Sequence, residues 1–545
     1  MSVRWCRECG VPLLSETCSS CGREAGRVIA PDLSPVFAEE IDCLTLELGA
    51  HDLAGVTSEH VLWASGVHYY GQGRRLITLR DLSSGTPRLE ILDSDGMREL
   101  AQAGGDGVNR PGFSASFKGR FLDANREHMQ RLEEEAASFI RETIASHPRH
   151  AILVAFSGGK DSIATSLLCR KAVGHSSVIH IFSDTTVEAP DTYDYLNRFQ
   201  QENPRVPLIR VGPTVDFHDM CTEIGPPSRI LRWCCSTHKA APMAKVVSAL
   251  ATDNAGVLTF DGIRAAESTR RSKYSRITRD AKIRNEVLAS PILQWSDLEV
   301  WAFLLSQRVD FNRGYRRGFR RVGCLPCPLN SRWSEFLASR YYPEWYSSWR
   351  AFLENHAQRL GHPNPSQFSR EGWRARAGGN GLEHQRASLR KETCDQEART
   401  HTYELVREWS DSALEYLKPL GVIRVESDDG VILRFEILDP KSRHVLASAR
   451  VSRPRSHIRI RFAERSNLRL HIQRVERQLR KFQSCVQCGS CATACPSGAL
   501  TVNGRYAVED RSCNRCQLCV RAACVAEESL KRKGRSVEWK TCSGS

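Results

Sequence analysis

The clearest hydrophobic pattern in the chain is an apolar run at Ala151–Phe156, which ends at a short segment of polar residues and glycine. A run of this length predicts a buried strand and is too short for a helix. The next segment, Ser157–Ser162 (SGGKDS), lets the chain turn sharply, and the apolar residues of Ile163–Leu168 then have helical spacing. The sequence therefore predicts a strand, a glycine-rich turn and a helix in direct succession.

A glycine-rich turn before a helix predicts an anion site, because backbone N–H groups converge there and the helix dipole adds positive potential. We expect this loop to hold a phosphate or sulfate group. Its spacing fits neither GxxxxGK[ST] nor GxGxxG, and an ordinary strand-to-helix turn would not need this combination of residues. The residues expected at the anion are Ser157, Gly158, Gly159, Lys160, Asp161 and Ser162.

Strands and helices continue to alternate after this loop. Val178–Ser183, Pro207–Val211 and Gly256–Phe260 are strand-like, and helical stretches lie between them. This alternation predicts an α/β fold with a parallel sheet and a site at the carboxyl ends of its strands. Asp184 directly follows one of these strands and Asp261 follows another.

The region before this core has a different pattern. Residues 30–115 contain apolar or alternating pieces, such as Cys43–Leu48 and Arg75–Thr78, among many turn residues, which predicts a small β-rich domain. The region faintly resembles PUA-type RNA-binding barrels, and a plain β-domain is the alternative. One amphipathic helix is expected over Leu122–Ile144.

After the core, residues 346–385 are rich in Trp, Arg and Gly and are interpreted as a linker before an α+β region. A helix is expected near residues 401–418. A hairpin turn at Asp429-Gly430 is expected to join the strands Val422–Val425 and Val431–Leu438. Ser456–Phe462 alternates apolar with cationic side chains, so one face of this strand should be packed and the other positively charged.

Composition and charge narrow the class of protein. The 545 residues are too many for one core, and a hydrophobic content of 41% indicates globular domains. No apolar run reaches the length of a membrane span and the first residues lack an apolar signal core, so we expect a cytoplasmic protein without a membrane partner. The net charge is +14, and Lys441–Lys481 holds thirteen Lys and Arg against two acids. That stretch favours a polyanion-binding surface over an ordinary solvated face.

The 21 cysteines are mostly clustered. In a reducing compartment, CxxC pairs bind metal more often than they form disulfides. Two such pairs near the N-terminus can close a tetrahedral site of four thiolates, which predicts a zinc ribbon that folds around its metal. The expected zinc ligands are Cys6, Cys9, Cys18 and Cys21.

Two cysteine runs near the C-terminus match the ferredoxin motif C-x2-C-x2-C-x3-C, except that four residues precede the last cysteine of the second run. In this motif the fourth cysteine of each run binds the other cluster, so two [4Fe–4S] clusters are predicted. One is expected on Cys485, Cys488, Cys491 and Cys524, and the other on Cys495, Cys513, Cys516 and Cys519.

Five segments in order resemble the motifs of the phosphoadenosine phosphosulfate (PAPS) reductase family, within the PP-loop ATP pyrophosphatase superfamily. They are SGGKDS (157–162), FSDTTVEAPDT (182–192), GIRAAESTRR (262–271), PILQWSDLEVW (291–301) and NRGYRRGFRRVGCLPCP (312–328). The resemblance implies a PP-loop domain that binds an adenine nucleotide, with Asp184 in the nucleotide pocket and Arg264 and Arg270 on anionic substrate groups. The family's usual DTG-like turn reads Asp184-Thr185-Thr186 here.

The same domain contains an adjacent pair, Cys234-Cys235, and a CxxC pair, Cys324 and Cys327. The pattern is similar to the CC…CxxC arrangement of the iron–sulfur branch of sulfonucleotide reductases. This resemblance implies a third [4Fe–4S] cluster on Cys235, Cys324 and Cys327, with Cys234 as its fourth ligand or as a free thiol. Zinc and unligated cysteines are the alternatives, because thiolates suit both zinc and iron–sulfur clusters. The residues to which the resemblance assigns catalysis are Asp161, Cys235, Cys324 and Cys327.

We therefore divide the chain into eight segments. They are a zinc ribbon (1–26), a β-rich domain (30–115), a helical lead-in (116–150), the PP-loop domain (151–345), a linker (346–385), a basic α+β domain (386–482), a ferredoxin-type domain (483–530) and a tail (531–545).

These segments favour two enzyme functions over a third, non-enzymatic one. Thiol-dependent sulfonucleotide reductases carry a nucleophilic cysteine in an ECGLH-like tail, but the only Glu-Cys-Gly here contains Cys9 of the zinc ribbon. We therefore favour ATP-dependent sulfur transfer to a nucleic acid, RNA or DNA, in which the ferredoxin-type segment supplies electrons and donor proteins for sulfur and electrons are further partners. The alternative is reduction of adenylyl sulfate or PAPS with electrons from the ferredoxin-type segment. A redox-sensing binder of nucleic acid would leave the anion loop without a purpose.

Overall fold

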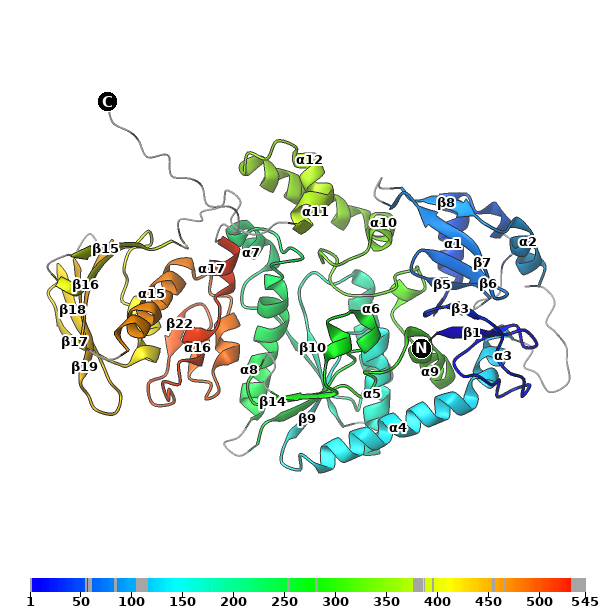
Figure 1. Ribbon diagram of the computed structural model, residues 1–545, viewed down its shortest axis with the longest axis horizontal. Helices are drawn as coiled ribbons and strands as arrows, with labels where there is room; N and C mark the ends of the chain where they lie inside the picture. The colour runs from blue at the N-terminus through cyan, green and yellow to red at the C-terminus, as the bar shows by residue number, and fades with distance from the viewer. Residues whose placement is uncertain are drawn as a thin grey trace.

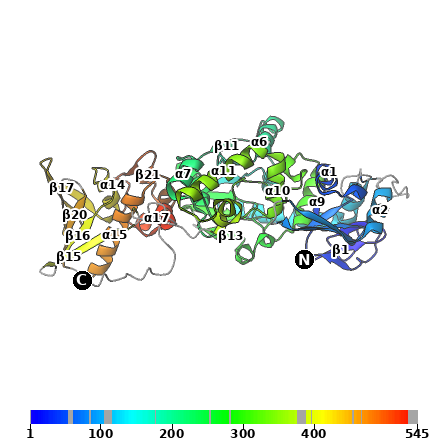
Figure 2. The ribbon, with the colours of Figure 1, turned by 90° about the horizontal axis from the view of Figure 1, so that it is seen from above.

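A computed structural model describes residues 2–530 apart from 54–55, 57–60, 83–85, 104–115, 176, 252–254, 280–282, 376–385, 387, 395–396, 453–455 and 465–466. The N-terminal sheets, the central sheet and the C-terminal sheet follow one another along the long axis (Figure 1). The view from above shows the same order (Figure 2). Among the described helices, none is long and apolar enough to cross a membrane.

The central sheet has six strands in the order β11-β10-β9-β12-β14-β13. Their bounds are β9 Ala151–Ala155, β10 Ile179–Ser183, β11 Leu208–Val211, β12 Val257–Phe260, β13 Ile277–Arg279 and β14 Glu286–Ala289. The four predicted strands, β9 to β12, pair in parallel. Strand β14 also pairs with β12 in parallel, and β13 adds an antiparallel edge. The predicted α/β fold with a parallel sheet is confirmed.

Helices connect and cover these strands, and local signals explain where they begin and end. They are α5 Lys160–Val173, α6 Pro190–Glu202, α7 Phe217–Ile224, α8 Ala241–Leu250 and α9 Asp297–Gln307. Helix α5 ends at Gly174, which has a left-handed φ of 79° that glycine adopts without strain. Helix α9 begins with a capping box between Ser296 and Glu299, so two backbone N–H groups at its end are satisfied.

The N-terminal part contains two small antiparallel sheets. The first has the strands β1 Val3–Cys6, β2 Val11–Leu13 and β3 Val28–Ala30, and the second has β4 Ser34–Pro35, β5 Trp63–Ser65, β6 His68–Gly71, β7 Arg74–Arg80 and β8 Arg88–Ile91. Helices α1 Ala38–Leu48 and α2 Ser94–Ala103 lie beside the second sheet. The strand-like interpretation of Cys43–Leu48 is wrong. Ile41 and Leu44 are buried at helical spacing, and Gly49 ends α1 in the left-handed conformation.

The predicted single helix over Leu122–Ile144 is two helices, α3 Phe117–Ala124 and α4 Arg126–Ala145. They meet at Asn125, whose amide donates to the carbonyls of Pro12 and Phe121 and accepts from the backbone N–H of Leu14. A buried amide with these three partners fixes the chain direction, so the helix breaks where it contacts the N-terminal cysteine segment.

The interpretation of residues 346–385 as a linker is wrong for its described part. Residues 332–375 are largely helical, in α10 Arg332–Tyr341, α11 Pro343–Arg359, α12 Pro365–Gln367 and α13 Trp373–Ala375. Trp349, Leu353 and Trp373 are buried in a core shared with α7. The tryptophans that made this segment look irregular are its packing residues. Residues 376–385 lie outside the described part of the chain.

A six-stranded antiparallel sheet follows, in the order β15-β16-β20-β19-β18-β17. Its strands are β15 Arg390–Cys394, β16 Glu397–Glu404, β17 Val422–Asp428, β18 Ile432–Leu438, β19 Val445–Ser452 and β20 His457–Phe462. The hairpin at Asp429-Gly430 and the alternating strand are confirmed. The helix near residues 401–418 is only α14, Ala413–Leu417, because residues 400–404 pair with β20 as part of strand β16.

The C-terminal segment lies between this sheet and the central domain (Figure 1). It begins after α15 Leu468–Ser484 and contains β21 Leu500–Val502, β22 Tyr506–Val508, α16 Leu518–Arg521 and α17 Val525–Leu530. Among the described residues, hydrogen bonds join it to the central domain: Thr214 Oγ1 donates to the Gln487 carbonyl at 3.2 Å, Asn285 Nδ2 to the Pro496 carbonyl at 2.9 Å, and the backbone N–H of Arg284 to the Thr493 carbonyl at 3.3 Å.

Candidate active site and metal centres

The predicted anion loop lies between β9 and α5, at the carboxyl edge of the sheet. Gly158 has a φ of 71°, which a residue with a Cβ adopts only at a cost. Inside the turn, the backbone N–H of Ser157 donates to Ser162 Oγ at 3.2 Å, and this hydroxyl donates to the Gly159 carbonyl at 2.8 Å. The two serines therefore hold the shape of the loop from within.

A tyrosine distant in sequence completes the loop. The backbone N–H of Lys160 donates to the Tyr315 hydroxyl at 2.9 Å, and Tyr315 is buried. A Cβ on Gly159 would lie 3.3 Å from this hydroxyl and 3.6 Å from Val322 Cγ2. The segment that contains Tyr315 and Val322 thus lies directly over the loop glycine.

The side chain of Lys160 points into the protein, where it joins a network of four charged groups. Its Nζ lies 3.0 Å from Asp161 Oδ2 and 2.9 Å from Asp297 Oδ1. Arg264 bridges the same carboxylates, with Nε 2.6 Å from Asp161 and Nη2 2.7 Å from Asp297. Two cations and two anions satisfy one another in a site where Lys160 and Arg264 are 3% and 4% exposed.

The pKa values in this network follow from its geometry. Burial would lower the pKa of Lys160, but the carboxylates of Asp161 and Asp297 raise it above the usual range. Burial would raise the pKa of Asp297, but Lys160 and Arg264 hold it below its usual value. Lys160 and Asp297 are therefore charged near neutral pH.

The network also reaches the N-terminal part of the chain. Asp32 accepts hydrogen bonds from the backbone N–H groups of Asp297 and Leu298, at 2.7 and 3.1 Å, and so caps α9. Ser34 Oγ donates to Asp297 Oδ2 at 2.5 Å. The N-terminal β-rich part is thereby tied to the charged groups that support the loop.

The remaining predicted nucleotide residues lie at the ends of neighbouring strands. Asp184 Oδ1 accepts from the Tyr193 hydroxyl and from the backbone N–H of Thr186, both at 2.8 Å. Thr186 itself has a φ of 64°, a left-handed conformation that is costly for a β-branched residue. Arg270 is exposed, whereas Arg264 is buried in the network described above.

Cys324 lies beside the end of β10, close to this turn. It forms a β-bridge with Glu188, and its Sγ is 3.2 Å from Glu188 Oε1 and 3.4 Å from Thr185 Oγ1. Burial, reinforced by the charge of Glu188, raises the pKa of the Cys324 thiol to about 12. Lys239 lies nearby, with Nζ 3.7 Å from Glu188 Oε1.

The other three cysteines of this group come from two further places. Cys234 precedes a π-helical turn, Cys235–Ala240, which is a rare conformation that is frequent at functional sites. The sulfur of Cys235 raises the pKa of Cys234, with burial and then the more distant charges of Cys324 and Cys327 adding to the effect. The fold therefore brings all four predicted cysteines into one region.

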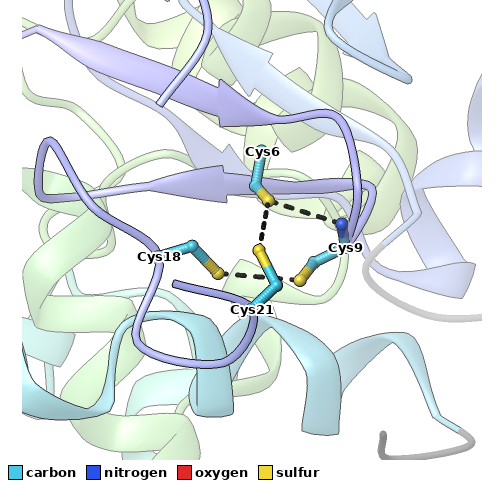
Figure 3. A group of neighbouring side chains, drawn as sticks. All are labelled: Cys6, Cys9, Cys18 and Cys21. Carbon is cyan, nitrogen blue, oxygen red and sulfur yellow. Dashed lines mark hydrogen bonds between the residues drawn. The ribbon is translucent and has the colours of Figure 1, made fainter. Parts of the chain in front are cut away.

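The N-terminal cysteines are much more tightly grouped (Figure 3). Cys6 Sγ lies 3.6 Å from Cys21 Sγ, and Cys9 Sγ lies 3.6 Å from Cys18 Sγ. Four thiolates at 2.3 Å from one zinc ion are about 3.8 Å apart, so the four sulfurs fit a tetrahedral zinc site. Among the described residues, no other three candidate ligand atoms lie within 4.8 Å of one another.

The eight C-terminal cysteines fall into two spatial groups. The charge of Cys524 raises the pKa of Cys488 beyond the effect of burial, and Cys485 does the same for Cys524. The pKa of Cys519 is raised to about 11 by burial and by the charge of Cys495, Cys513 and Cys516. Each group thus contains three cysteines of one run and the last cysteine of the other.

Two parts of the chain match known protein families. Residues 151–330 match the phosphoadenosine phosphosulfate reductase domain. This match contains the anion loop and every strand of the central sheet. Residues 482–501 match the 4Fe-4S binding domain, which covers the first C-terminal cysteine run.

Individual proteins are similar over parts of the chain. An uncharacterized protein of Methanocaldococcus jannaschii is 33% identical over 43% of this chain and 48% of its own length. Adenosine 5'-phosphosulfate reductase of Geobacillus kaustophilus is 25% identical over 27% of this chain and 60% of its own length. The PAPS reductase of Candida auris, solved with phosphate, is 16% identical over 37% of this chain and 95% of its own, with a TM-score of 0.27. The chain spans about half the length of the first curated relatives that it matches.

Several residues that build the site are not apparent from the sequence alone. Tyr315 and Glu188 lie within the segments that resemble the family but have no local signal of their own, and Lys239 and Asp32 lie outside these segments. Gly262 had such a signal, since it follows a strand directly, but its role was missed. A Cβ at Gly262 would lie 2.7 Å from the backbone carbonyl carbon of Asp161, so only glycine lets this strand end approach the loop.

Proposed function

We propose that the protein binds ATP at Ser157–Ser162 and transfers sulfur to a nucleic acid at the neighbouring cysteine site. The observation that carries this proposal is the shared position of loop and cysteines. Val322 lies over Gly159, and Cys324, two residues further along the same segment, contacts Thr185 at the end of β10. A nucleotide on the loop and a sulfur at these cysteines would therefore meet at one edge of the sheet.

The loop suits the first half of the reaction. Its backbone N–H groups and the N-terminus of α5 stabilise the negative charge of the phosphates. An oxygen of the acceptor base attacks the α-phosphorus of ATP, the bond to the β-phosphate breaks, and pyrophosphate leaves. The acceptor oxygen is then part of an adenylate and becomes a good leaving group.

The cysteine site suits the second half. A sulfide sulfur attacks the carbon that bears the adenylate, the new C–S bond forms, and AMP leaves with the electron pair of the broken C–O bond. This step is redox-neutral when the sulfur arrives as sulfide. Lys239, close to Glu188 and Cys324, supplies positive charge where anionic sulfur would be held.

The spacing of their sulfur atoms divides the cysteines into a group suited to zinc and groups suited to iron–sulfur clusters. The N-terminal sulfurs have the separation that one zinc ion requires, whereas the central and C-terminal groups are more widely spaced among the described residues. Wider spacing fits a [4Fe–4S] cluster, because each cysteine then binds a different iron atom. We assign such clusters to the two C-terminal groups and to Cys234, Cys235, Cys324 and Cys327. When bound, they would supply electrons and a site for sulfur.

A second candidate function is reduction of adenylyl sulfate or PAPS to sulfite. It is favoured by the similarity to adenosine 5'-phosphosulfate reductases, one of which is 25% identical over 60% of its length. The position of Cys9, the only cysteine in a Glu-Cys-Gly sequence, argues against a thiol-dependent reductase. Its sulfur is buried within the N-terminal group, 3.6 Å from Cys18. Reduction would then need electrons directly from the clusters.

One anaerobic assay separates the two functions. Purified protein is incubated with ATP, tRNA and sulfide, or with adenylyl sulfate or PAPS and a reductant. Thiolation predicts AMP and pyrophosphate in equal amounts and a thiolated nucleoside in the digested tRNA. Release of sulfite from a sulfonucleotide, without nucleic acid, would replace this proposal by the reductase.

A further inference from the structure

A buried lysine, Lys481, lies in the last turn of α15, shortly before the first cysteine of the C-terminal segment. It is only 3% exposed. Its Nζ donates to the backbone carbonyl of Cys519 at 2.6 Å, so the ammonium group points towards α16, which contains this cysteine. Both α16 and α17 contact α15 (Figure 1). No step of the function proposed above uses this lysine.

The protein provides no carboxylate to compensate this ammonium group. Among the residues that the structure describes, no carboxylate oxygen lies within 4.0 Å of Lys481 Nζ, and the Cys519 carbonyl is its one hydrogen-bond acceptor. Glu527 of α17 is paired with Arg480, at 3.3 Å. Lys160 is equally buried but has carboxylate oxygens at 3.0 and 2.9 Å. A buried ammonium group is costly unless an anion compensates it, so another anion is expected beside Lys481.

The thiols that feel the charge of Lys481 belong to both C-terminal cysteine groups. Burial raises the pKa of Cys491 and of Cys519, and the charge of Lys481 opposes this rise in each. Burial raises the pKa of Cys524 as well, and Lys481 again lowers it. Cys491 and Cys524 belong to one group and Cys519 to the other. The ammonium group is therefore close to both groups and favours the thiolate form in both.

The group that contains Cys519 also forms a site that fits a cluster. One cavity has all four of its cysteines in the wall, together with apolar side chains such as Leu500 and Val508. Those cysteines are Cys495, Cys513, Cys516 and Cys519. The charge of four thiolates exceeds that of the iron–sulfide core that they hold, so a bound [4Fe–4S] cluster is an anion. Clusters in the two groups would supply the negative charge that Lys481 lacks.

We propose that Lys481 is the shared counter-ion of the two C-terminal clusters and raises the reduction potential of both. Reduction adds one electron to a cluster and makes it more negative, so a fixed cation nearby stabilises the reduced form. Because Lys481 is buried, salt and water screen this interaction only weakly. The inference rests on the cluster assignment proposed above and adds the residue that determines how readily these clusters accept electrons.

The test compares Lys481→Met with Lys481→Arg in full-length, cluster-loaded protein under anaerobic conditions. Methionine has a similar length but no charge, whereas arginine keeps the charge. Lys441→Met is the matched control, because it removes the same charge from an exposed turn between β18 and β19. Dithionite supplies the electrons in a redox titration that is followed by electron paramagnetic resonance. Cys488→Ser and Cys516→Ser, one in each group, identify the signal of each cluster.

Both potentials should fall in K481M. At the wild-type midpoint potential of each cluster, the ratio of reduced to oxidised cluster should drop at least tenfold, which corresponds to about 59 mV for one electron. K481R should keep both potentials close to those of the wild type because the charge remains. K441M should leave both unchanged, because water screens an exposed charge. A lysine that served only to hold the Cys519 carbonyl would not lower both potentials together.

The other outcomes would decide against the proposal or isolate its cause. If K481M keeps its iron and both potentials stay at the wild-type values, Lys481 is not a counter-ion. A shift of one cluster alone would also overturn the proposal, since a shared role requires both. If K481M loses iron, K481R decides: retained iron with wild-type potentials attributes the requirement to charge, whereas loss of iron there too attributes it to packing and overturns the proposal. Wild-type protein without iron at the C-terminal cysteines would disprove the cluster assignment itself, and this inference with it.

Discussion

Lys160 Nζ lies 2.9 Å from Asp297 Oδ1, which joins the first turn of the anion loop helix to the first turn of α9. Arg264 and Asp161 complete this network, and Asp32 extends it to the N-terminal region. Lys160 and Arg264 occur in motifs whose cations we expected to bind phosphate. In the structure their side chains are held by carboxylates, and we infer that they fix the backbone of the loop.

Replacing Asp297 with Asn should therefore destabilise the central domain. It leaves two buried cations with a single carboxylate, and breaking such a pair costs about 3 kcal/mol or more. The pKa of Asp297 is lowered in the folded protein, so its contribution is present above the ordinary aspartate pKa of about 4 and is lost as pH falls below it. Urea unfolding should show a large difference between wild type and D297N at pH 7 that shrinks towards pH 3. If the difference in unfolding free energy between wild type and D297N is the same at pH 7 and pH 3, the charge of Asp297 is not what stabilises the domain.

The glycines at the loop give a second prediction. Gly262→Ala places a Cβ 2.7 Å from the carbonyl carbon of Asp161, which cannot move without moving the loop. Gly159→Val crowds the Tyr315 hydroxyl and the backbone N–H groups. Both variants should lose ATP binding by at least tenfold and keep their full iron content.

Gly212→Ala is the matched control for these glycines, because it lies at the same sheet edge and its nearest neighbour would be 3.9 Å away. It should bind ATP as wild type does in isothermal titration. Undiminished affinity in G262A and G159V would exclude the loop as the nucleotide site.

The sequence predicted those features that depend on local patterns. The strand, loop and helix at Ala151–Val173 and the paired CxxC motifs needed only nearby residues. The contact of Tyr315 with Lys160 spans 155 positions and has no local signal. The helices of residues 343–375 were missed because tryptophan, arginine and glycine were interpreted by composition and not by spacing.

Thr186 allows a test of stored backbone strain. Its φ of 64° costs a β-branched residue about 1–2 kcal/mol, and glycine would relieve this while adding about 0.5–1 kcal/mol of chain entropy to the unfolded state. Thr186→Gly should therefore leave the free energy of unfolding unchanged or raise it by at most about 1.5 kcal/mol. Thr185→Gly is the neighbouring control and should destabilise, because the Thr185 hydroxyl donates to Glu188 at 2.8 Å. Equal losses in both variants, measured by urea unfolding, would show that the left-handed turn stores no strain.

The metal content provides the last prediction. Clusters at the central site and at both C-terminal groups, with zinc at the N-terminal group, predict about twelve iron atoms and one zinc per chain. The double variant Cys324→Ser and Cys327→Ser should lose about four irons and no zinc, because no three of the four central cysteine sulfurs lie within 4.8 Å of one another. Cys9→Ser is the converse control and should lose zinc alone, since Cys9 Sγ lies 3.6 Å from Cys18 Sγ in the compact group. Elemental analysis and electron paramagnetic resonance of anaerobic protein measure both changes. A second zinc that disappears with Cys324 and Cys327, while iron stays constant, would assign zinc to the central site and remove the iron–sulfur basis of the reductase alternative.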